Sequence, residues 1–156
     1  MLFYLNLLLK DLLKKVGSNM KTVEVVAAVI KKDNKILATQ RGYGHFKGGW
    51  EFPGGKPEEG ESNQQALVRK IKEELNADIK VDEYICTVEY DYKDPDFHLT
   101  MHTFFCELLN DHMELVYHDE ERLEHESMKW LSKDELDTVD WLGADIEIVN
   151  ELKQLL

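Results

Sequence analysis

Residues 54–77 read GGKPEEGESNQQALVRKIKEELNA, and this stretch decides how the rest of the chain is interpreted. Its second half predicts a helix that starts at a capping box, because Ser62 and Gln65 have the spacing at which each side chain binds the other's backbone N–H. Asn76 can end the helix, since asparagine tolerates the left-handed backbone conformation. Apolar residues recur at intervals of four and form the buried stripe: Leu67, Ile71 and Leu75.

Two adjacent glutamates near the end of this helix, Glu73 and Glu74, are the candidate reactive groups. At about 100° per residue they lie on the flank away from the apolar stripe, with Lys70 between them. The glycine turn at residues 54–55 can bring backbone carbonyls close to that flank. Carboxylates with a carbonyl are hard oxygen ligands, which suit Mg²⁺ or Mn²⁺ and not zinc.

The alternative is an ordinary exposed helix surface, with Arg69–Glu73 and Lys70–Glu74 as ion pairs one turn apart. Two features count against it. The basic residue precedes the acid, which is the poorer orientation, and two glutamates in the last turn oppose the helix dipole at about 0.3–1 kcal/mol each. Exposed helices tolerate costs of that size, so the residues alone leave both interpretations open.

The same stretch resembles the Nudix box, G-x5-E-x7-R-E-U-x-E-E-x-G-U, where U is aliphatic. Residues 50–54, WEFPG, are similar to the lead-in of MutT-like members, and the strand order agrees across about residues 21–156. The resemblance implies the Nudix fold, an α/β/α sandwich around a mixed β-sheet. It also implies Mg²⁺-dependent hydrolysis of a nucleoside diphosphate linked to another group. Six residues match the box in register: Gly55, Glu61, Arg69, Ile71, Glu73 and Glu74.

The residue roles follow from the resemblance, position by position. Glu61 and Arg69 correspond to the pair that braces the loop against the helix. Glu124, in the segment EHESMKW, matches an acid of the late loop that completes the metal shell in MutT-like relatives. Its alternative role is as one more acid near the acidic run at residues 119–121. The implied metal ligands are one backbone carbonyl and three carboxylates: Gly54, Glu73, Glu74 and Glu124.

Two residues depart from the box. Asn76 replaces a glycine, which is a mild change for the reason given above. Lys70 replaces a glutamate that binds metal or acts as general base in several members of the family. Because a protonated lysine cannot be a ligand and supplies compensating charge, it should weaken Mg²⁺ binding by its neighbours. The resulting hypothesis is a working site in which Glu73 or Glu124 handles the attacking water but which needs more metal.

Three residues are the candidate substrate contacts. Arg41 resembles the arginine that contacts substrate phosphates, although an arginine at a strand end is usually only solvated. Asp145 falls where MutT-like triphosphate pyrophosphohydrolases read the base, and its carboxylate can accept a hydrogen bond from an exocyclic amino group. Its alternative role is to cap the last helix. Phe97, with Phe46 and Tyr90, could stack on a base or belong to the core.

The expected reaction is hydrolysis of a nucleoside triphosphate to the monophosphate and pyrophosphate. The pattern is nearest to the CTP pyrophosphohydrolase branch, so CTP, dCTP or an oxidised dGTP is the expected substrate. Other nucleoside diphosphate derivatives such as ADP-ribose would keep the same metal helix. Lys70 also allows a catalytically weak domain that binds nucleotides as a sensor.

The flanking sequence predicts a sheet with helices against it. Residues 23–31 are a β-branched and alanine run, and Asp33 and Asn34 join it as a hairpin to residues 35–41. A brief helix should open at Ser132. The last helix should run from about Asp145, with Ile148 or Val149, Leu152 and Leu155 facing inward. Further strands are expected at four places: residues 50–52, 84–92, 99–108 and 128–131.

The composition limits the partners and the compartment. Nineteen basic residues against 31 acidic ones give a net charge of −12, which argues against binding nucleic acid polymers. Cys86 and Cys106 lack metal-site spacing and read as reduced thiols of a cytoplasmic protein. Residues 1–19 read as an amphipathic extension or as sequence upstream of a start at Met20, so we expect the domain to span residues 20–156. Their apolar run is too short to cross a membrane, and a homodimer stays open.

Overall fold

Strand β1 (Lys21–Lys32) forms the centre of a mixed sheet. The structure is a computed structural model that describes residues 1–2, 5–6, 20–94, 96–117 and 124–156. β1 pairs in parallel with β6 (Phe97–Leu108), from Lys21 opposite Phe97 to Lys31 opposite Glu107. β6 then pairs in antiparallel fashion with β5 (Ile79–Tyr92). The two kinds of pairing confirm the mixed sheet that the sequence predicted.

The hairpin between β1 and β2 (Lys35–Arg41) separates just beyond its turn. Asp33 and Asn34 form the turn with positive φ of 51° and 62°, and only the two residue pairs next to it are in register. Farther along, β1 pairs with β4 (Gly54–Gly55), while β2 pairs with β3 (Trp50–Glu51) and β7 (His125–Leu131). This separation places the glycine strand β4 beside β1.

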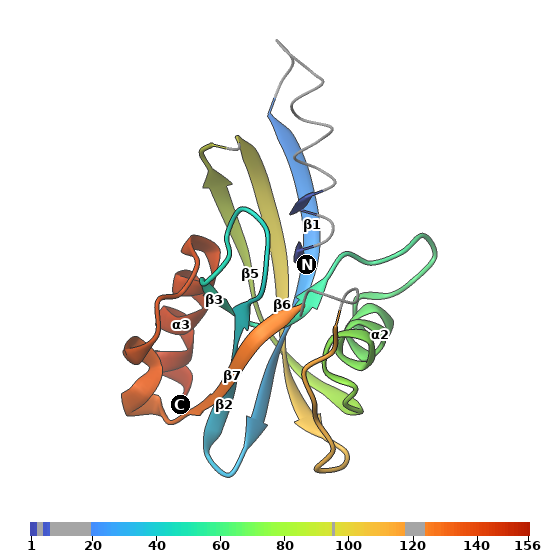
Figure 1. Ribbon diagram of the computed structural model, residues 1–156, viewed down its shortest axis with the longest axis vertical. Coiled ribbons are helices and arrows are strands. Elements are labelled where there is room, and N and C mark those ends of the chain that lie inside the picture. The colour runs from blue at the N-terminus through green and yellow to red at the C-terminus, as the bar shows by residue number, and fades with distance from the viewer. Residues whose placement is uncertain (3–4, 7–19, 95, 118–123) are drawn as a thin grey trace.

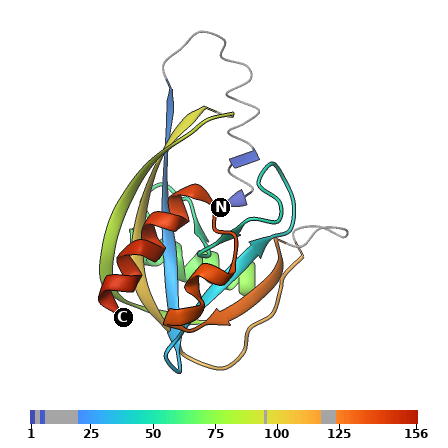
Figure 2. The same ribbon diagram turned by 90° about the vertical axis from the view of Figure 1, so that its left-hand side faces the viewer.

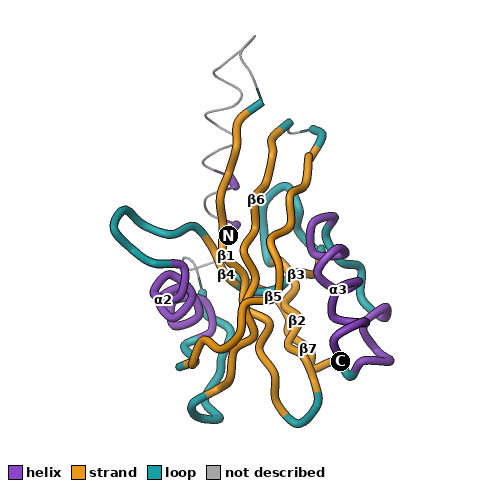
Figure 3. Tube along the Cα trace, turned by 180° about the vertical axis from the view of Figure 1, so that it is seen from behind, coloured by secondary structure: helices purple, strands orange, loops and turns teal. Residues whose placement is uncertain are grey.

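Two helices cover opposite faces of the sheet, which gives the three layers of the predicted α/β/α sandwich (Figures 1 and 3). Helix α2 (Asn63–Leu75) has the predicted capping box, and Asn76 ends it with φ of 49°. Helix α3 (Gly143–Leu155) follows the short 3-10 helix η1 (Lys133–Thr138) and lies across the other face (Figure 2). The three apolar residues of the α2 stripe are all fully buried against the sheet: Leu67, Ile71 and Leu75.

Several predicted boundaries were too short. β5 begins at Ile79 and β7 at His125, earlier than expected. In β5 the alternating Ile79 and Val81 are followed by the polar pair at residues 82–83, and in β7 residues 125–127 are all polar. The prediction that Leu155 faces inward was wrong. This residue is 54% exposed at the end of α3, whereas Ile148, Val149 and Leu152 are buried. In the described part of the chain, no helix is long and apolar enough to cross a membrane.

Candidate active site

The two carboxylates of α2 flank Lys70, as the helical wheel predicted, but they differ in exposure. Glu73 is half exposed, whereas Glu74 is only 3% exposed and Lys70 is also buried. The wheel treats the helix in isolation, but β4 lies against this side of α2. A Cβ on Gly55 would come within 2.4 Å of Lys70 Cε. The lysine stem therefore packs on the glycine backbone.

Arg69 ties the loop before the helix to the helix itself. Its Nε and one terminal nitrogen each donate to a different oxygen of Glu61 at 2.8 Å. Its Nη1 donates to Glu73 Oε1 at 3.2 Å. Its Nη2 also donates to the Lys56 carbonyl at 3.1 Å. The hydrogen bonds from Arg69 and from the Glu58 backbone hold the pKa of Glu61 at about 2. The geometry is that of a brace, as the sequence predicted.

The oxygens of Gly54 and Glu74 converge on one positive charge. The α-ammonium of Met1 donates to the Gly54 carbonyl at 3.0 Å and to Glu74 Oε1 at 3.1 Å. The second oxygen of Glu74 is buried and has no hydrogen-bond partner among the described residues. A carbonyl and a carboxylate are the ligand types that Mg²⁺ prefers. The ligand types of these two residues therefore fit a divalent cation.

Gly54 presents its carbonyl because the strand β4 lies very close to β1. A Cβ on Gly54 would lie 2.0 Å from the Val26 carbonyl oxygen, so no other residue fits there without displacing backbone. The side chains alone make only a partial metal site. Within the described ranges, no three histidine, cysteine, aspartate or glutamate side chains are close enough together to hold an ion.

Glu124 precedes β7 and points into the protein, not into solvent. It is buried, and Tyr43 Oη lies 3.5 Å from its Oε2. Two backbone hydrogen bonds hold it in place: the Gly42 N–H donates to the Glu124 carbonyl, and the Glu124 N–H donates to the Val116 carbonyl. The acidic run at residues 119–121, the alternative context for Glu124, lies outside the described residues. Burial removes Glu124 itself from the solvated surface.

Arg41 belongs to a buried cluster of charged side chains, so the expectation of a merely solvated strand-end arginine does not apply. Its Nε donates to Glu51 Oε2 at 2.7 Å, and each of the two side chains is 1% exposed. His125 Nε2 lies 3.4 Å from the other Glu51 oxygen. Burial raises the pKa of Glu51, but Arg41 and His125 outweigh it and hold the pKa at about 2. Glu51 is therefore ionised.

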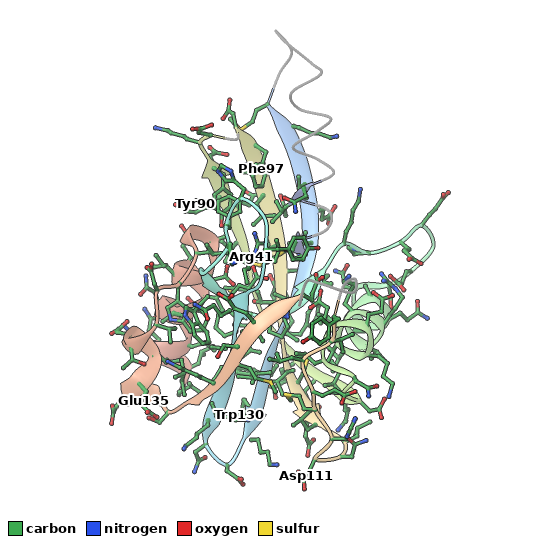
Figure 4. All side chains as sticks on the ribbon, in the orientation of Figure 1. Arg41, Tyr90, Phe97, Asp111, Trp130 and Glu135 are labelled. Carbon is green, nitrogen blue, oxygen red and sulfur yellow. The ribbon has the colours of Figure 1, made fainter. Side chains whose placement is uncertain are left out.

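One terminal nitrogen of Arg41 is left for a ligand. Nη1 is buried and has no hydrogen-bond partner among the described residues. Such a donor is costly to leave unpaired, and an anion can satisfy it. Figure 4 shows Arg41 near the middle of the molecule, with Trp130 and Asp111 toward its lower end.

Asp145 lies inside the first turn of α3 and does not cap the helix, because the helix starts after Leu142. Its Oδ1 accepts a hydrogen bond from the Phe52 N–H at 2.9 Å, and the residue is 1% exposed. Burial, and then the neighbouring Glu51 carboxylate, raise the pKa of Asp145 well above its usual value. The carboxyl group keeps its proton at a pH where an ordinary aspartate is ionised.

Replacing Asp145 by asparagine should stabilise the fold at high pH. In the unfolded state the carboxyl of Asp145 has a pKa near 3.9. In the folded state its pKa is raised, so above about pH 3.9 the folded protein still holds a proton that the unfolded chain has released. Stability is therefore lost as the pH rises above that value. Asparagine keeps the acceptor for Phe52 without this loss, so thermal melting at pH 8 should show a Tm increase of about 2–4 °C per kcal/mol recovered. The Tm increase of Asp145→Asn should vanish near pH 4. A Tm increase that is the same at every pH would contradict the prediction.

Phe97 is not placed as a substrate contact. It is 1% exposed, and its ring stacks on Tyr92 with the centroids 5.0 Å apart. Met1 and Leu5 belong to the same apolar cluster. Phe97 therefore packs as a core residue, which is the alternative that the sequence left open. Phe46 is only partly buried, and its ring lies 5.2 Å from the Arg41 guanidinium carbon.

One surface hollow lies away from these groups. It measures about 800 Å³ and is lined by residues of the β1–β2 turn, β6 and the end of α3, including Lys31, Asp33 and Glu107. Met1, Leu2 and Leu5 are all buried beside the predicted site.

Two residues of the buried cluster were not predicted from the sequence. Glu51 and His125 lie 10 and 84 positions after Arg41 in the sequence, and they meet it because β2 pairs with both β3 and β7. The sequence places Glu51 inside the predicted strand at residues 50–52 and His125 shortly before the predicted strand at residues 128–131, which gives no sign that they meet.

Comparison with known proteins finds the same family as the Nudix-box residues on and before α2. A family model described as the NUDIX domain matches residues 20–151.

The chain belongs to the Nudix family.

The relatives within this family are hydrolases. The Nudix chain is 36% identical over 137 residues to the CTP pyrophosphohydrolase of Escherichia coli K12, covering 87% of this chain and 95% of that protein. An 8-oxo-dGTP diphosphatase of Proteus vulgaris is 40% identical over 86 residues, which are 54% of this chain and 75% of the relative. The solution structure of the E. coli ORF135 protein aligns with a TM-score of 0.67 and 33% identity, covering 87% of this chain and 91% of that one. The Nudix chain is an enzyme that acts on acid anhydrides.

Proposed function

We propose that this Nudix enzyme hydrolyses a nucleoside or deoxynucleoside triphosphate to the monophosphate and pyrophosphate, with Mg²⁺ or Mn²⁺ as cofactor. The observation that carries the proposal is the convergence of the Gly54 carbonyl and the Glu74 carboxylate on the Met1 ammonium, at 3.0 and 3.1 Å. The similarity to the CTP pyrophosphohydrolase over 95% of that protein supports cytidine nucleotides as substrates. The similarity to an 8-oxo-dGTP diphosphatase supports an oxidised guanine nucleotide.

In this proposal, the metal-binding residues are Gly54, Glu73, Glu74 and Glu124. A bound divalent ion would offset phosphate charge and lower the pKa of a water molecule. Arg69 and Glu61 act through Glu73, because Arg69 binds both carboxylates and thereby sets the position of Glu73 on the helix. Glu73 and Glu124 are the carboxylates that can take the proton from the attacking water.

Arg41 is the proposed phosphate contact. The reaction adds a water oxygen to phosphorus and breaks a P–O bond between the α and β phosphates, so negative charge grows on the leaving pyrophosphate. Arg41 Nη1, which lacks a partner among the described residues, can donate to a phosphate oxygen. Glu51 holds the guanidinium through Nε and so fixes its direction.

Asp145 is the proposed reader of the base. Its Oδ1 is already bonded to the Phe52 N–H, so its other oxygen is the one that can meet a substrate. When ionised, this oxygen accepts a hydrogen bond from the amino group of cytosine or adenine. When protonated, it donates to a ring or carbonyl acceptor instead. The raised pKa of Asp145 makes base preference depend on pH.

We also propose the bounds of the domain, the class of ligand and the cellular location. The Nudix domain spans residues 20–156, in keeping with the family match to residues 20–151, and residues 1–19 are an extension. The net charge of −12 supports free nucleotides, and not a nucleic acid polymer, as the ligand. The free thiols of Cys86 and Cys106 support a cytoplasmic location. A homodimer is compatible with this function.

A panel of nucleotides tests the function. CTP, dCTP and 8-oxo-dGTP should release pyrophosphate in the presence of Mg²⁺ or Mn²⁺, with kcat/KM at least about tenfold above that for dTTP or ADP-ribose, since discrimination by a base-reading group is worth this much. Products are separated as pyrophosphate, phosphate and monophosphate by anion exchange. Preferred cleavage of ADP-ribose would assign a different Nudix substrate. Nucleotide binding without turnover would assign the sensor role that Lys70 allows.

A further inference from the structure

Helix α3 begins without a cap from the residue that precedes it. This N-cap residue is Leu142, whose apolar side chain makes no cap hydrogen bond in the described chain. The first N–H groups of a helix have no partner inside the helix and need an acceptor from elsewhere. Helix α2 meets this need locally, because the Ser62 side chain accepts from the Gln65 N–H. The first turn of α3 has to find its acceptor in another element.

Tyr92, the last residue of β5, supplies that acceptor. The Ala144 N–H, which is the second in α3, donates to Tyr92 Oη at 3.1 Å. The two residues are 52 positions apart in the sequence, so this bond joins the end of β5 to the start of α3. Burial raises the pKa of Tyr92 above its usual value, and the hydroxyl is therefore neutral at physiological pH.

The ring of Tyr92 is fixed by other aromatic rings. Its centroid lies 5.0 Å from that of Phe97, 5.2 Å from that of Phe46 and 4.7 Å from that of Tyr90. Tyr90 reaches the same turn of α3, because a Cβ on Gly143 would lie 2.4 Å from Tyr90 Oη. Rings packed this closely hold one orientation, so the Tyr92 hydroxyl stays directed at the helix start.

Asp145, the proposed reader of the base, directly follows Ala144 in this turn. Its N–H donates to the Leu142 carbonyl at 2.9 Å, and its Oδ1 accepts from the Phe52 N–H. The first turn of α3 thus determines where the other carboxyl oxygen points. Groups that recognise a ligand have to be held to within about 0.5 Å of their working position. A small shift of the turn would therefore weaken base recognition.

We propose that Tyr92 is a positioning residue for base recognition: its hydroxyl caps α3 from β5 and thereby fixes the carboxyl of Asp145 against the base of the substrate. This inference rests on the proposed function, because it takes Asp145 as the reader of the base. Tyr92 itself does not touch the substrate in this role. Loss of its hydroxyl should affect the choice between bases more than the chemical step.

The experiment compares hydrolysis of CTP and UTP by the full-length enzyme, because UTP carries a carbonyl where CTP carries the amino group. The wild type should favour CTP in kcat/KM by about tenfold. Tyr92→Phe keeps the ring and removes only the hydroxyl. Its preference for CTP should fall at least about threefold, as expected for one lost hydrogen bond. The fall should come from a higher KM for CTP, with kcat within about twofold, whereas a general loss of folded enzyme would lower both rates equally.

Tyr84→Phe is the matched control. Tyr84 lies on the same strand, and its hydroxyl also makes a hydrogen bond, to Thr87 at 2.7 Å. Its side chain is 56% exposed and has no contact with α3 among those described above. The ratio of kcat/KM for CTP to that for UTP should stay within about twofold of the wild type, as is usual for surface changes.

Leu142→Ser tests whether capping is the cause. Leu142 has φ of −65° and ψ of 153°, close to the −72° and 163° of the capping residue Ser62. A serine at position 142 therefore has the backbone geometry to accept from the Ala144 N–H through its own side chain. The double variant Tyr92→Phe/Leu142→Ser should regain most of the preference for CTP.

Hydrogen exchange of the Ala144 amide, followed by NMR on ¹⁵N-labelled protein without substrate, measures the cap directly. Exchange should be at least about fivefold faster in Tyr92→Phe and should slow again in the double variant, because a lost cap lets the helix end open. Wild-type exchange at Ala144 or a wild-type CTP preference in Tyr92→Phe would overturn the inference alone. A wild type that hydrolyses nucleotides without preferring CTP would remove Asp145 as the reader of cytosine and this inference with it. Absence of any nucleotide hydrolysis would instead remove the proposed function.

Discussion

Replacement of Glu74 by glutamine is expected to lower kcat for nucleotide hydrolysis by about 10²–10³-fold, the range seen when one electrostatic contact to a reacting group is lost. Glu74 is the buried carboxylate that meets the Gly54 carbonyl around one cation, and its second oxygen has no partner in the described chain. Glutamine has nearly the same shape, but it removes the negative charge and turns one ligand oxygen into an N–H donor. The loss should therefore be in metal binding and catalysis.

The rate is measured as pyrophosphate release from the preferred nucleotide over a range of Mg²⁺ concentrations. Glu59→Gln is the control, because Glu59 is an exposed glutamate of the loop before the same helix, and its kcat should stay within about twofold, as usual for such surface changes. A Glu74→Gln enzyme with wild-type kcat and an unchanged Mg²⁺ requirement would show that Glu74 is not a ligand.

Replacement of Arg41 by methionine is expected to lower the free energy of unfolding by about 3–5 kcal/mol, the usual result of removing one partner from a buried ion pair. Arg41 and Glu51 are joined at 2.7 Å and almost completely buried. Without the guanidinium, Glu51 keeps only His125 as a polar neighbour from the cluster. Denaturation in urea at pH 7 measures the change.

The double variant Arg41→Met/Glu51→Gln separates the pair from its surroundings. It should recover most of the lost stability, because a neutral pair does not leave a buried charge uncompensated. The loss in Arg41→Met should also shrink as the pH falls from 7 to 4. In the wild type, Glu51 with a pKa of about 2 contributes stability that is present above its unfolded pKa of about 4.3 and is lost toward pH 2. Without Arg41 the carboxyl takes up a proton earlier. A loss below about 1 kcal/mol would contradict a structural role for the pair.

The sequence predicted the local features of the site well. The capping box at Ser62, the left-handed Asn76 and the apolar stripe of α2 depend only on residues within four positions of one another. The brace between Glu61 and Arg69, which are eight positions apart, was implied by the spacing of the family motif. The layers and the mixed sheet followed from the family resemblance and not from the apolar pattern alone.

The features that the sequence did not predict depend on contacts between segments that are far apart in the sequence. The burial of Glu74 and Lys70 follows from the contact of β4 with α2, which no helical wheel contains. Asp145 was assigned as a possible cap because aspartate is common there, whereas the docking of α3 turns its carboxyl toward the Phe52 N–H. Phe97 is buried because Tyr92, across the β5–β6 turn, stacks on it.

The position of the Met1 nitrogen has a practical consequence for handling this protein. In a protein whose first residue is Met1, a formyl group or an affinity tag joined to this nitrogen turns the ammonium into a neutral amide, which cannot compete as a cation for the Gly54 and Glu74 oxygens. The apparent metal affinity then reflects the chemistry of the first residue as well as that of the ligands. A tag placed after Leu156 leaves the amino terminus unmodified and is the appropriate choice for any titration with metal ions.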